Sequence, residues 1–263
     1  MARYCALFSG SKGNCTYIGT SAGGLLVDVG VSAKRIKEAL AARELDPQDI
    51  RGVCITHEHA DHIAGLKVLT KQFGWTVYAS RGTLSALLEE GCVASGSDLV
   101  PLDAKPVAIG EMLVTPFHTP HDARESMGFC VELPDERKIA VATDMGVMRG
   151  EVQALLAACD LVHIESNHDI AMLKNGSYPF YLKERILSNN GHLSNTMCAT
   201  TISALAKAGV TRFTLAHLSE QNNTPALALS TTRAALERDG FKEGNEYLLE
   251  AAAPASQKAL TIF

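Results

Sequence analysis

The chain has 263 residues, of which 46% are hydrophobic, so it can bury a full core and lies at the upper end of the size range for one domain. Its formal net charge of −5 argues against a protein that coats nucleic acid by bulk positive charge, although a local basic groove stays compatible with it. No apolar run approaches the length of a membrane span, and we expect no signal peptide. The seven cysteines include no CxxC pair, which favours reduced thiols and a cytoplasmic location.

The predicted elements begin with strands in each half of the chain and place helices between the later strands. Strands are predicted at residues 3–8, 15–19, 24–28, 52–56, 76–79, 112–117, 127–133, 138–142, 161–165, 211–216, 247–253 and 259–263. Helices are predicted at residues 32–44, 61–73, 83–90, 147–158, 178–188, 195–207 and 225–239. Cys54, Cys130 and Cys159 lie in apolar runs and are expected to be buried. With no linker and no repeat, the pattern favours one four-layer domain over residues 1–263, with two sheets face to face and helices outside.

Residues 57–62 read His-Glu-His-Ala-Asp-His, which places four possible metal ligands within six positions. They follow the apolar run 52–56, which reads as a buried strand, and precede a segment with helical spacing. His57 and His59 are two apart at the end of a strand and therefore point the same way. Asp61 and His62 lie on the turn beyond and suit a second ion. Because the chain has only nine histidines, we interpret the pattern as a metal site and not as a histidine-rich polar loop.

Later strand ends offer the ligands that a dinuclear site would still need. The strand 112–117 is followed by His118 and His121, and we favour His121, because a proline turn projects it away from the strand. Asp144 ends an apolar strand, where a carboxylate can bridge two cations. His217 ends another strand. Together with the hexapeptide these residues give a set of five histidines and two aspartates.

In this order the ligands resemble those of the metallo-β-lactamase-fold hydrolases, and the resemblance covers nearly the whole chain. It implies an α/β fold, the αβ/βα four-layer sandwich with two mixed sheets and helices outside. It also implies two divalent metal ions, zinc or manganese. The ligands implied for one ion are His57, His59 and His121, and those for the other are Asp61, His62 and His217. Asp144 would bridge the two ions.

Four further motifs resemble one branch of this family, the YycJ-like (WalJ) proteins, which are similar to DNA exonucleases. They are Phe-Ser-Gly-Ser-Lys-Gly-Asn-Cys at 8–15, Glu-Ser-Asn-His-Asp at 165–169, Gly-His-Leu-Ser-Asn at 191–195 and Leu-Ala-His-Leu-Ser at 215–219. The hexapeptide specifies only the superfamily, whereas the motifs at 165–169 and 191–195 indicate the branch. The resemblance implies a phosphodiesterase that acts on nucleic acid as a 5′-to-3′ DNA exonuclease.

Two bridged cations with imidazole and carboxylate ligands suit hydrolysis. They lower the pKa of a bridging water, supply hydroxide near neutral pH and stabilise charge on a phosphoryl oxygen. Asp61 can orient that hydroxide, so we give it a catalytic role as well as a metal-binding one. His192 is the candidate to protonate the leaving oxygen, by resemblance to the histidine of tRNA-processing relatives, and a helix-capping surface histidine is the alternative. His163 alternates within an apolar strand and is predicted to be a core histidine.

Candidate substrate contacts come from two of these motifs. Ser11 and Asn14 belong to a small-residue loop whose backbone N–H groups could hold a phosphate oxygen, although a glycine-rich hairpin turn gives the same letters. Asn167 and His168 are the other candidates. His168 could touch phosphate, lie against a metal or order its loop, and the sequence does not decide between these roles.

Basic and aromatic residues near the expected site allow two interpretations each. The basic residues are Lys12, Arg124, Lys174, Lys183 and Arg185. They form either a local track for a polyanion or an ordinary solvated surface. Tyr178, Phe180 and Tyr181 could stack on bases, but we favour aromatic side chains that pack their helix against its neighbours.

Two other classes of function use the same ligands. One is a small-molecule hydrolase such as a glyoxalase-type thioesterase, and the other is a metal-dependent binding protein without turnover. A true β-lactamase is less favoured, because those enzymes lack the bridging aspartate. No room remains for the flavin domain of a flavodiiron oxidoreductase, or for a β-CASP insertion between Asp144 and His217. We therefore expect DNA as the partner and no membrane, while RNA and the oligomeric state stay open.

Overall fold

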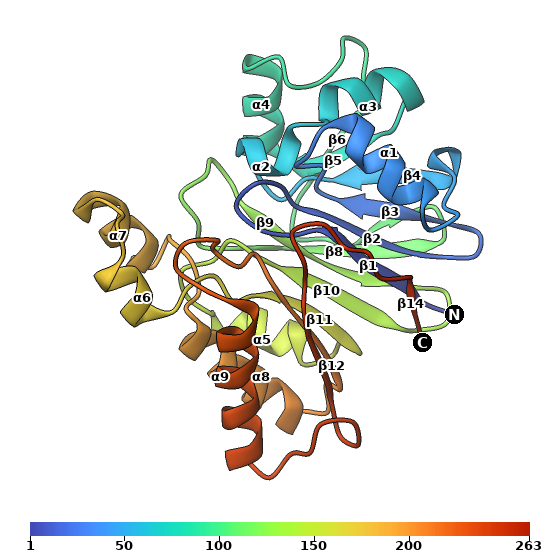
Figure 1. The fold of residues 1–263 in the computed structure, drawn as a ribbon. Helices are drawn as coiled ribbons and strands as arrows, with labels where there is room; N and C mark the ends of the chain where they lie inside the picture. The colour runs from blue at the N-terminus through green and yellow to red at the C-terminus, as the bar shows by residue number, and fades with distance from the viewer. The chain divides into compact units, whose positions relative to one another are not determined.

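The computed structural model describes residues 1–263, and the chain divides into two compact units. Unit 1 comprises residues 1–118, 123–137 and 253–263, and unit 2 comprises residues 119–122 and 138–252. Both units combine strands with helices (Figure 1). None of the helices has the length and apolar character that crossing a membrane requires. The organisation of residues 1–263 as one domain stays a prediction.

Unit 1 contains a mixed sheet of seven strands in the order β14-β1-β2-β3-β4-β5-β6. Its strands are β1 (Arg3–Phe8), β2 (Cys15–Thr20), β3 (Gly23–Val27), β4 (Ile50–Cys54), β5 (Val77–Ser80), β6 (Leu99–Leu102) and β14 (Thr261–Ile262). The pairs from β14 to β3 are antiparallel, and the pairs from β3 to β6 are parallel. Unit 1 also holds the antiparallel strands β7 (Val107–Ile109), β8 (Met112–His118) and β9 (Met127–Glu132).

Helices pack against the parallel part of this sheet. They are α1 (Ala33–Ala41), α2 (Ala60–Ile63), α3 (Leu66–Phe73) and α4 (Arg81–Glu89), with a 3-10 turn η1 (Pro47–Asp49), and Figure 1 shows α1, α3 and α4 grouped around β4, β5 and β6. One core cluster joins Leu26 and Val53 of the sheet to Ile36 and Leu40 of α1 and Leu69 of α3. Burial of each such side chain stabilises the folded state by about 1.5–3 kcal/mol. This core packs against β3 and β4, and the turn after β4 carries the candidate ligands of unit 1.

Unit 2 is built on four parallel strands in the order β10-β11-β12-β13. They are β10 (Lys138–Ala142), β11 (Leu161–Glu165), β12 (Arg212–Ala216) and β13 (Leu248–Ala251). The helices are α5 (Gly150–Leu156), α6 (Ile170–Asn175), α7 (Phe180–Leu187), α8 (Asn195–Lys207) and α9 (Pro225–Arg238), and α8 lies beside α9 (Figure 1). Because the carboxyl ends of parallel strands meet at one edge of a sheet, the residues that follow β10, β11 and β12 lie close together.

Most predicted elements are present, and the differences have local causes. The helix predicted at 61–73 is two helices, and the break falls at Gly65. The Gly65 N–H donates to the Val29 carbonyl at 2.9 Å, and a Cβ at Gly65 would lie 2.6 Å from the Val31 carbonyl oxygen. The sequence analysis does not predict β6, β7, α6 or η1, because segments of three to six residues show too little periodicity. No disulfide joins any of the seven cysteines, and Cys54, Cys130 and Cys159 are buried, as predicted.

The interpretation of the aromatic residues as helix packing is wrong for two of the three. Phe180 is 77% exposed and Tyr181 is 74% exposed, whereas Tyr178 is half-buried. The reason is that α7 is a short helix whose single buried side chain is Ile186, so the face that carries the aromatic rings has no neighbour.

His163 is a core residue of β11, as the alternation of the strand predicts, with an exposed fraction of 3%. Burial, assisted by the charge of His217, lowers the pKa of His163 to about 3. The ring is therefore neutral at pH 7. In the unfolded chain an ordinary histidine has a pKa of about 6.5. The unfolded state therefore binds the extra proton between these two values, and stability is lost as the pH falls through this window.

We expect His163→Leu to reduce the pH dependence of stability. The free energy of unfolding of the unmodified protein should fall with decreasing pH between pH 6 and 4, and His163 contributes up to about 1.4 kcal/mol per pH unit. Urea unfolding at several pH values measures this slope. The exposed His118, changed to leucine, serves as the control. Equal slopes in His163→Leu and the unmodified protein would exclude a buried neutral ring.

Candidate metal centre

The hexapeptide 57–62 forms the turn between β4 and α2 in unit 1. His57 and His62 are fully buried, while His59 and Asp61 are partly exposed. His57 Nε2 lies 3.0 Å from His59 Nδ1, and the ring centroids of His57 and His62 are 4.1 Å apart. Asp61 Oδ2 lies 3.5 Å from His62 Nε2. The four side chains predicted from the hexapeptide thus converge within unit 1.

A buried carboxylate behind this turn orients His62. Asp28, directly after β3, accepts hydrogen bonds from the Thr56 N–H at 2.8 Å and the Thr56 hydroxyl at 2.9 Å, and its Oδ2 lies 2.7 Å from His62 Nδ1. Burial raises the pKa of Asp28, while the charge and hydrogen bonds of His62 and Thr56 act in the opposite direction. An Nδ1–H that donates to Asp28 leaves the Nε2 lone pair of His62 for a metal ion. The sequence analysis does not identify Asp28, although its place after a strand is the signal that indicated Asp144.

The loop that contains Asn14 forms hydrogen bonds with the same turn. The Asn14 N–H donates to the Asp61 carbonyl at 2.8 Å, and Asn14 Nδ2 lies 3.2 Å from His62 Nε2. Gly30 is required here, because a Cβ at this position would lie 1.6 Å from the Asp61 carbonyl oxygen. Asn14 therefore holds the candidate ligands in place. Ser11, the other residue predicted from this loop, is exposed.

Unit 2 brings together a second group of titratable side chains. Asp144, Glu165, His192 and His217 offer ligand atoms that all lie within 4.8 Å of one another. Asp144 Oδ1 lies 3.3 Å from His217 Nδ1, 3.6 Å from His192 Nδ1 and 3.9 Å from His121 Nε2. Asp144 follows β10, Glu165 is the last residue of β11 and His217 follows β12, and because these parallel strands are neighbours, the three side chains lie close together.

Glu165 lies at the centre of this group and was missed as a site residue. Its Oε1 lies 2.8 Å from the Nδ1 atoms of both His192 and His217. Its Oε2 accepts backbone hydrogen bonds from Leu193 at 2.9 Å and Met145 at 3.2 Å. Burial by itself would raise the pKa of Glu165, but the charges and hydrogen bonds of the two histidines hold it below its ordinary value. The carboxylate thus fixes both rings with Nδ1 toward Glu165 and Nε2 away from it.

His121, and not His118, joins the group in unit 2. His121 is buried and its Nδ1 lies 3.1 Å from the Gly191 carbonyl oxygen, to which it can donate, whereas His118 is exposed at the end of β8. Burial lowers the pKa of His121, which favours the neutral ring that a metal ligand requires. Gly191 is constrained, because a Cβ there would lie 2.2 Å from the Ile186 carbonyl oxygen.

The two candidates from the motif at 165–169 differ in their surroundings. Asn167 Nδ2 donates to the His217 carbonyl at 2.9 Å, and the Asn167 N–H donates to the Leu193 carbonyl at 2.9 Å, so Asn167 orders the loops around it. His168 is 1% exposed and neither ring nitrogen has a hydrogen-bond partner. Burial lowers the pKa of His168 to about 4, so the ring is neutral at pH 7. An unsatisfied buried polar group costs about 1–3 kcal/mol, which a ligand at His168 would relieve.

Comparisons of sequence relate the chain to a known family. A family model described as "Beta-lactamase superfamily domain" matches residues 25–218. The chain is 35% identical over 251 residues to Exodeoxyribonuclease YycJ of Bacillus anthracis, with 93% of this chain and 92% of that protein covered. It is 34% identical over 262 residues to Exodeoxyribonuclease WalJ of Streptococcus pneumoniae, with 98% of this chain and 97% of that protein covered. These relatives confirm the predicted resemblance to the YycJ-like branch.

Comparisons of structure give the same fold. The metallo-β-lactamase fold protein YhfI from Bacillus subtilis matches with a TM-score of 0.72 at 15% identity, covering 97% of this chain and 98% of that chain. The Zn(2+)-bound PqqB from Methylobacterium extorquens matches with a TM-score of 0.73 at 16% identity, covering 99% of this chain and 100% of that chain. The predicted α/β fold class, with mixed sheets and flanking helices, is therefore confirmed. By its sequence and its fold, the chain belongs to the β-lactamase superfamily and has the metallo-β-lactamase fold.

Proposed function

We propose that the chain is a metal-dependent DNA exonuclease that removes nucleotides from the 5′ end of a strand with two divalent metal ions. The observation that carries the proposal is that each unit contains buried histidines whose Nδ1 atoms are held by a buried carboxylate, Asp28 in unit 1 and Glu165 in unit 2. The relatives named exodeoxyribonuclease, at 35% and 34% identity over most of the chain, support DNA as the substrate.

The donor atoms fit divalent cations. Neutral imidazole nitrogens and carboxylate oxygens suit zinc and manganese, and the buried side chains are already oriented by their hydrogen bonds. The residues that we propose as ligands are His57, His59, Asp61, His62, His121, Asp144 and His217. Bound ions would supply Lewis-acid stabilisation of phosphoryl charge and make water more acidic.

We propose a catalytic role for two side chains, one that orients water and one that donates a proton. Asp61, partly exposed beside His62, accepts a hydrogen bond from the attacking water and orients it. His192, with Nδ1 held at 2.8 Å from Glu165, donates the Nε2 proton to the leaving oxygen while the carboxylate balances the charge of the protonated ring.

The four predicted substrate contacts divide into two pairs. We propose His168 and Ser11 as contacts to the strand, because His168 has two unpartnered ring nitrogens and Ser11 is exposed. Asn14 and Asn167 already bond to the residues around the candidate ligands, so we propose that they position those ligands.

We propose further that residues 1–263 act as one domain without a β-CASP insertion, in the cytoplasm and without a membrane partner. Seven cysteines without a disulfide support a reducing compartment. An active site that no inserted domain covers would accept the end of a DNA strand.

Metal content tests the proposed ligand set. Protein saturated with zinc or manganese, and then freed of excess ion, is expected to bind about two equivalents per chain by elemental analysis. His59→Ala and His217→Ala should each lower the value to about one equivalent, while the exposed His118→Ala, as the control, should keep two. One equivalent in the saturated unmodified protein would contradict the dinuclear model.

Removal of His192 should slow DNA cleavage by roughly a hundredfold or more, with both metals retained, because the leaving oxygen loses its proton donor. Glu165→Gln should slow the reaction in the same direction, since a carboxamide cannot accept from both imidazoles and both backbone N–H groups. The exposed Glu184→Gln on α7 is the matched control. The loss in His192→Ala should shrink on a p-nitrophenyl phosphodiester, whose leaving group needs no proton. An equal loss on both substrates would assign His192 to positioning instead.

End-labelled substrates test the function itself. DNA labelled at the 5′ end should release its label in the first turnovers, and DNA labelled at the 3′ end only late. RNA and a panel of thioesters run in parallel, and Asp61→Asn serves as the control for contaminating nucleases. Early release from the 3′ end would refute the polarity. Thioester cleavage without any nuclease activity would place the protein among the small-molecule hydrolases.

A further inference from the structure

Unit 2 contains a pair of buried asparagines that the proposed chemistry does not use. Asn195 Nδ2 donates to Asn223 Oδ1 at 2.9 Å, and Asn223 Nδ2 donates to Asn195 Oδ1 at 2.8 Å. The two carboxamides thus form a reciprocal pair of hydrogen bonds. Both side chains are buried, so an amide group that lost its partner could not bond to water instead.

The neighbours of this asparagine pair fix the orientation of its amides. Asn223 Nδ2 also donates to the Ser166 carbonyl oxygen at 2.8 Å, and Asn223 Oδ1 accepts from the Thr224 N–H at 2.9 Å. Asn195 Oδ1 accepts a further hydrogen bond from the Ser166 hydroxyl at 2.7 Å. Rotation of the Asn223 amide would place its oxygen against the Ser166 carbonyl oxygen, so only one arrangement satisfies every group.

The asparagine pair joins the three chain segments that carry the carboxylate and the histidines of the site. Ser166 directly follows Glu165 at the end of β11. Asn195 lies three residues after His192, at the start of α8. Asn223 lies in the loop that follows β12 and precedes α9. Because each segment contributes a hydrogen-bonding group to the same cluster, the cluster sets the spacing between the segments.

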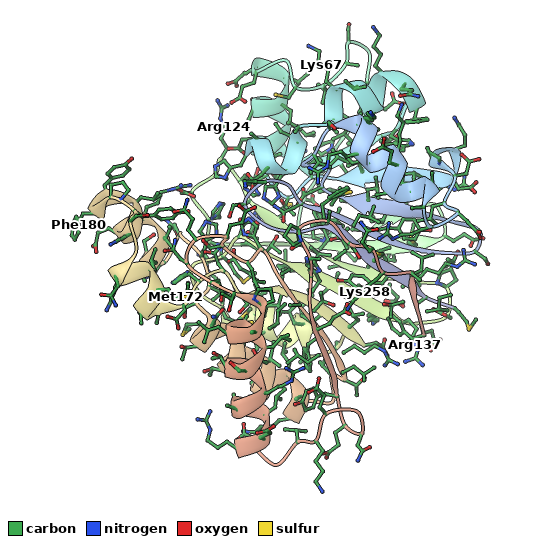
Figure 2. The ribbon with its side chains drawn as sticks, viewed as in Figure 1. Lys67, Arg124, Arg137, Met172, Phe180 and Lys258 are labelled. Carbon is green, nitrogen blue, oxygen red and sulfur yellow. The ribbon has the colours of Figure 1, made fainter.

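Backbone hydrogen bonds run between the same three segments. The Asn195 N–H donates to the His168 carbonyl at 2.8 Å, and the Asp169 N–H donates to the Asn222 carbonyl at 2.9 Å. The Asp169 side chain then caps α6 by accepting from the Met172 N–H at 2.8 Å, and Figure 2 labels Met172 on this helix. The asparagine pair and these backbone bonds therefore fix the three segments relative to one another.

The spacing of these segments matters because one oxygen atom bonds to two rings. Glu165 Oε1 lies 2.8 Å from Nδ1 of both His192 and His217. Hydrogen bonds of this kind weaken beyond about 3.2 Å, so a shift of the His192 ring by roughly half an ångström is enough to weaken its bond. The Asn167 side chain holds the His217 carbonyl independently of the asparagine pair. We therefore expect a loss of the pair to displace His192 first.

We propose that Asn195 and Asn223 are positioning residues, which act through His192 by holding its segment at the distance from Glu165 that proton donation requires. The proposal rests on the nuclease function and on the proposed role of His192. It also accounts for Ser166 and Asn195 in the motifs Glu-Ser-Asn-His-Asp and Gly-His-Leu-Ser-Asn, because both residues belong to the hydrogen-bonded cluster.

The first test compares Asn195→Ala in the unmodified protein and in a protein that lacks His192, with kcat measured on saturating end-labelled DNA. In the unmodified protein, Asn195→Ala should lower kcat about tenfold or more. In the His192→Ala protein, the same change should lower kcat by less than about twofold, because the residue through which Asn195 acts is already absent. Equal losses in the two proteins would overturn the proposal.

The leaving group gives a second readout, which a purely structural role would not change. The leaving group of bis(p-nitrophenyl) phosphate needs no proton, so the loss of kcat in Asn195→Ala should shrink on this substrate, as in His192→Ala. Elemental analysis should show the same metal content in Asn195→Ala as in the unmodified protein. A loss of kcat on bis(p-nitrophenyl) phosphate as large as that on DNA, or a lower metal content, would exclude action through His192.

Milder and matched variants separate positioning from damage to the fold. Ser166→Ala removes one hydrogen bond and leaves the asparagine pair, so kcat should fall less than in Asn195→Ala. Asn223→Asp places an oxygen against the Ser166 carbonyl oxygen, so its loss of kcat should match that of Asn195→Ala. The control is Ser203→Ala, about 12 Å along α8 from Asn195, which removes a hydrogen bond to Asp239. It should lower stability to urea and leave kcat unchanged.

The outcomes distinguish this proposal from the function on which it rests. DNA cleavage that Asn195→Ala and Asn223→Asp leave unchanged would overturn the positioning role and leave the nuclease standing. The absence of DNA cleavage by the unmodified protein would overturn both. If urea unfolding shows that Asn195→Ala does not fold, Ser166→Ala takes its place in the comparison with His192→Ala. Equal losses from Ser166→Ala with and without His192 would then contradict the positioning role.

Discussion

Hydrogen bonds between buried carboxylates and imidazoles fix the chemistry of the candidate site. Asp28 Oδ2 lies 2.7 Å from His62 Nδ1 in unit 1, and Glu165 Oε1 lies 2.8 Å from Nδ1 of both His192 and His217 in unit 2. In His62 and His217, an Nδ1–H that donates to the carboxylate leaves Nε2 with its lone pair, which is the form that binds a metal ion. A buried carboxylate without such donors would be strongly destabilised. Each carboxylate and its imidazole partners thus stabilise one another, and the hydrogen bonds between them set the orientation of the rings.

The backbone at the strand ends is adapted to aim these side chains. Asp28 follows β3, Asp144 follows β10 and His217 follows β12, and their φ angles are 60°, 58° and 53°. A left-handed backbone costs a residue other than glycine about 1–2 kcal/mol. Five residues other than glycine have a positive φ, and three of them are in the candidate site. The backbone strain is therefore concentrated where side chains must turn away from the strand direction. The hydrogen bonds between neighbouring parallel strands stabilise the strand ends and offset this cost in free energy.

The sequence predicts the parts of the fold and the site that local patterns determine. The hexapeptide, Asp144 and His217 could be identified because each couples a ligand type to the end of an apolar strand. Asp28 and Glu165 occupy the same kind of position, but a single acidic residue after a strand is also a common turn residue, and only the three-dimensional contacts show which imidazoles it holds. The helix break at Gly65 depends on a carbonyl 34 residues earlier in the chain, that of Val31, so helical periodicity gives no sign of it.

The prediction that the aromatic residues pack against a neighbouring helix is wrong for a related reason. Average behaviour favours burial of Phe180 and Tyr181 against a neighbouring helix, and the structure leaves both in solvent on a helix that buries one side chain. Rules of this kind describe the average helix and do not show which face of a short helix lacks a neighbour. The exposed rings lie on the helix whose Ile186 carbonyl holds the backbone of His192. A single short helix therefore carries both the exposed aromatic rings and the carbonyl that holds the backbone of His192.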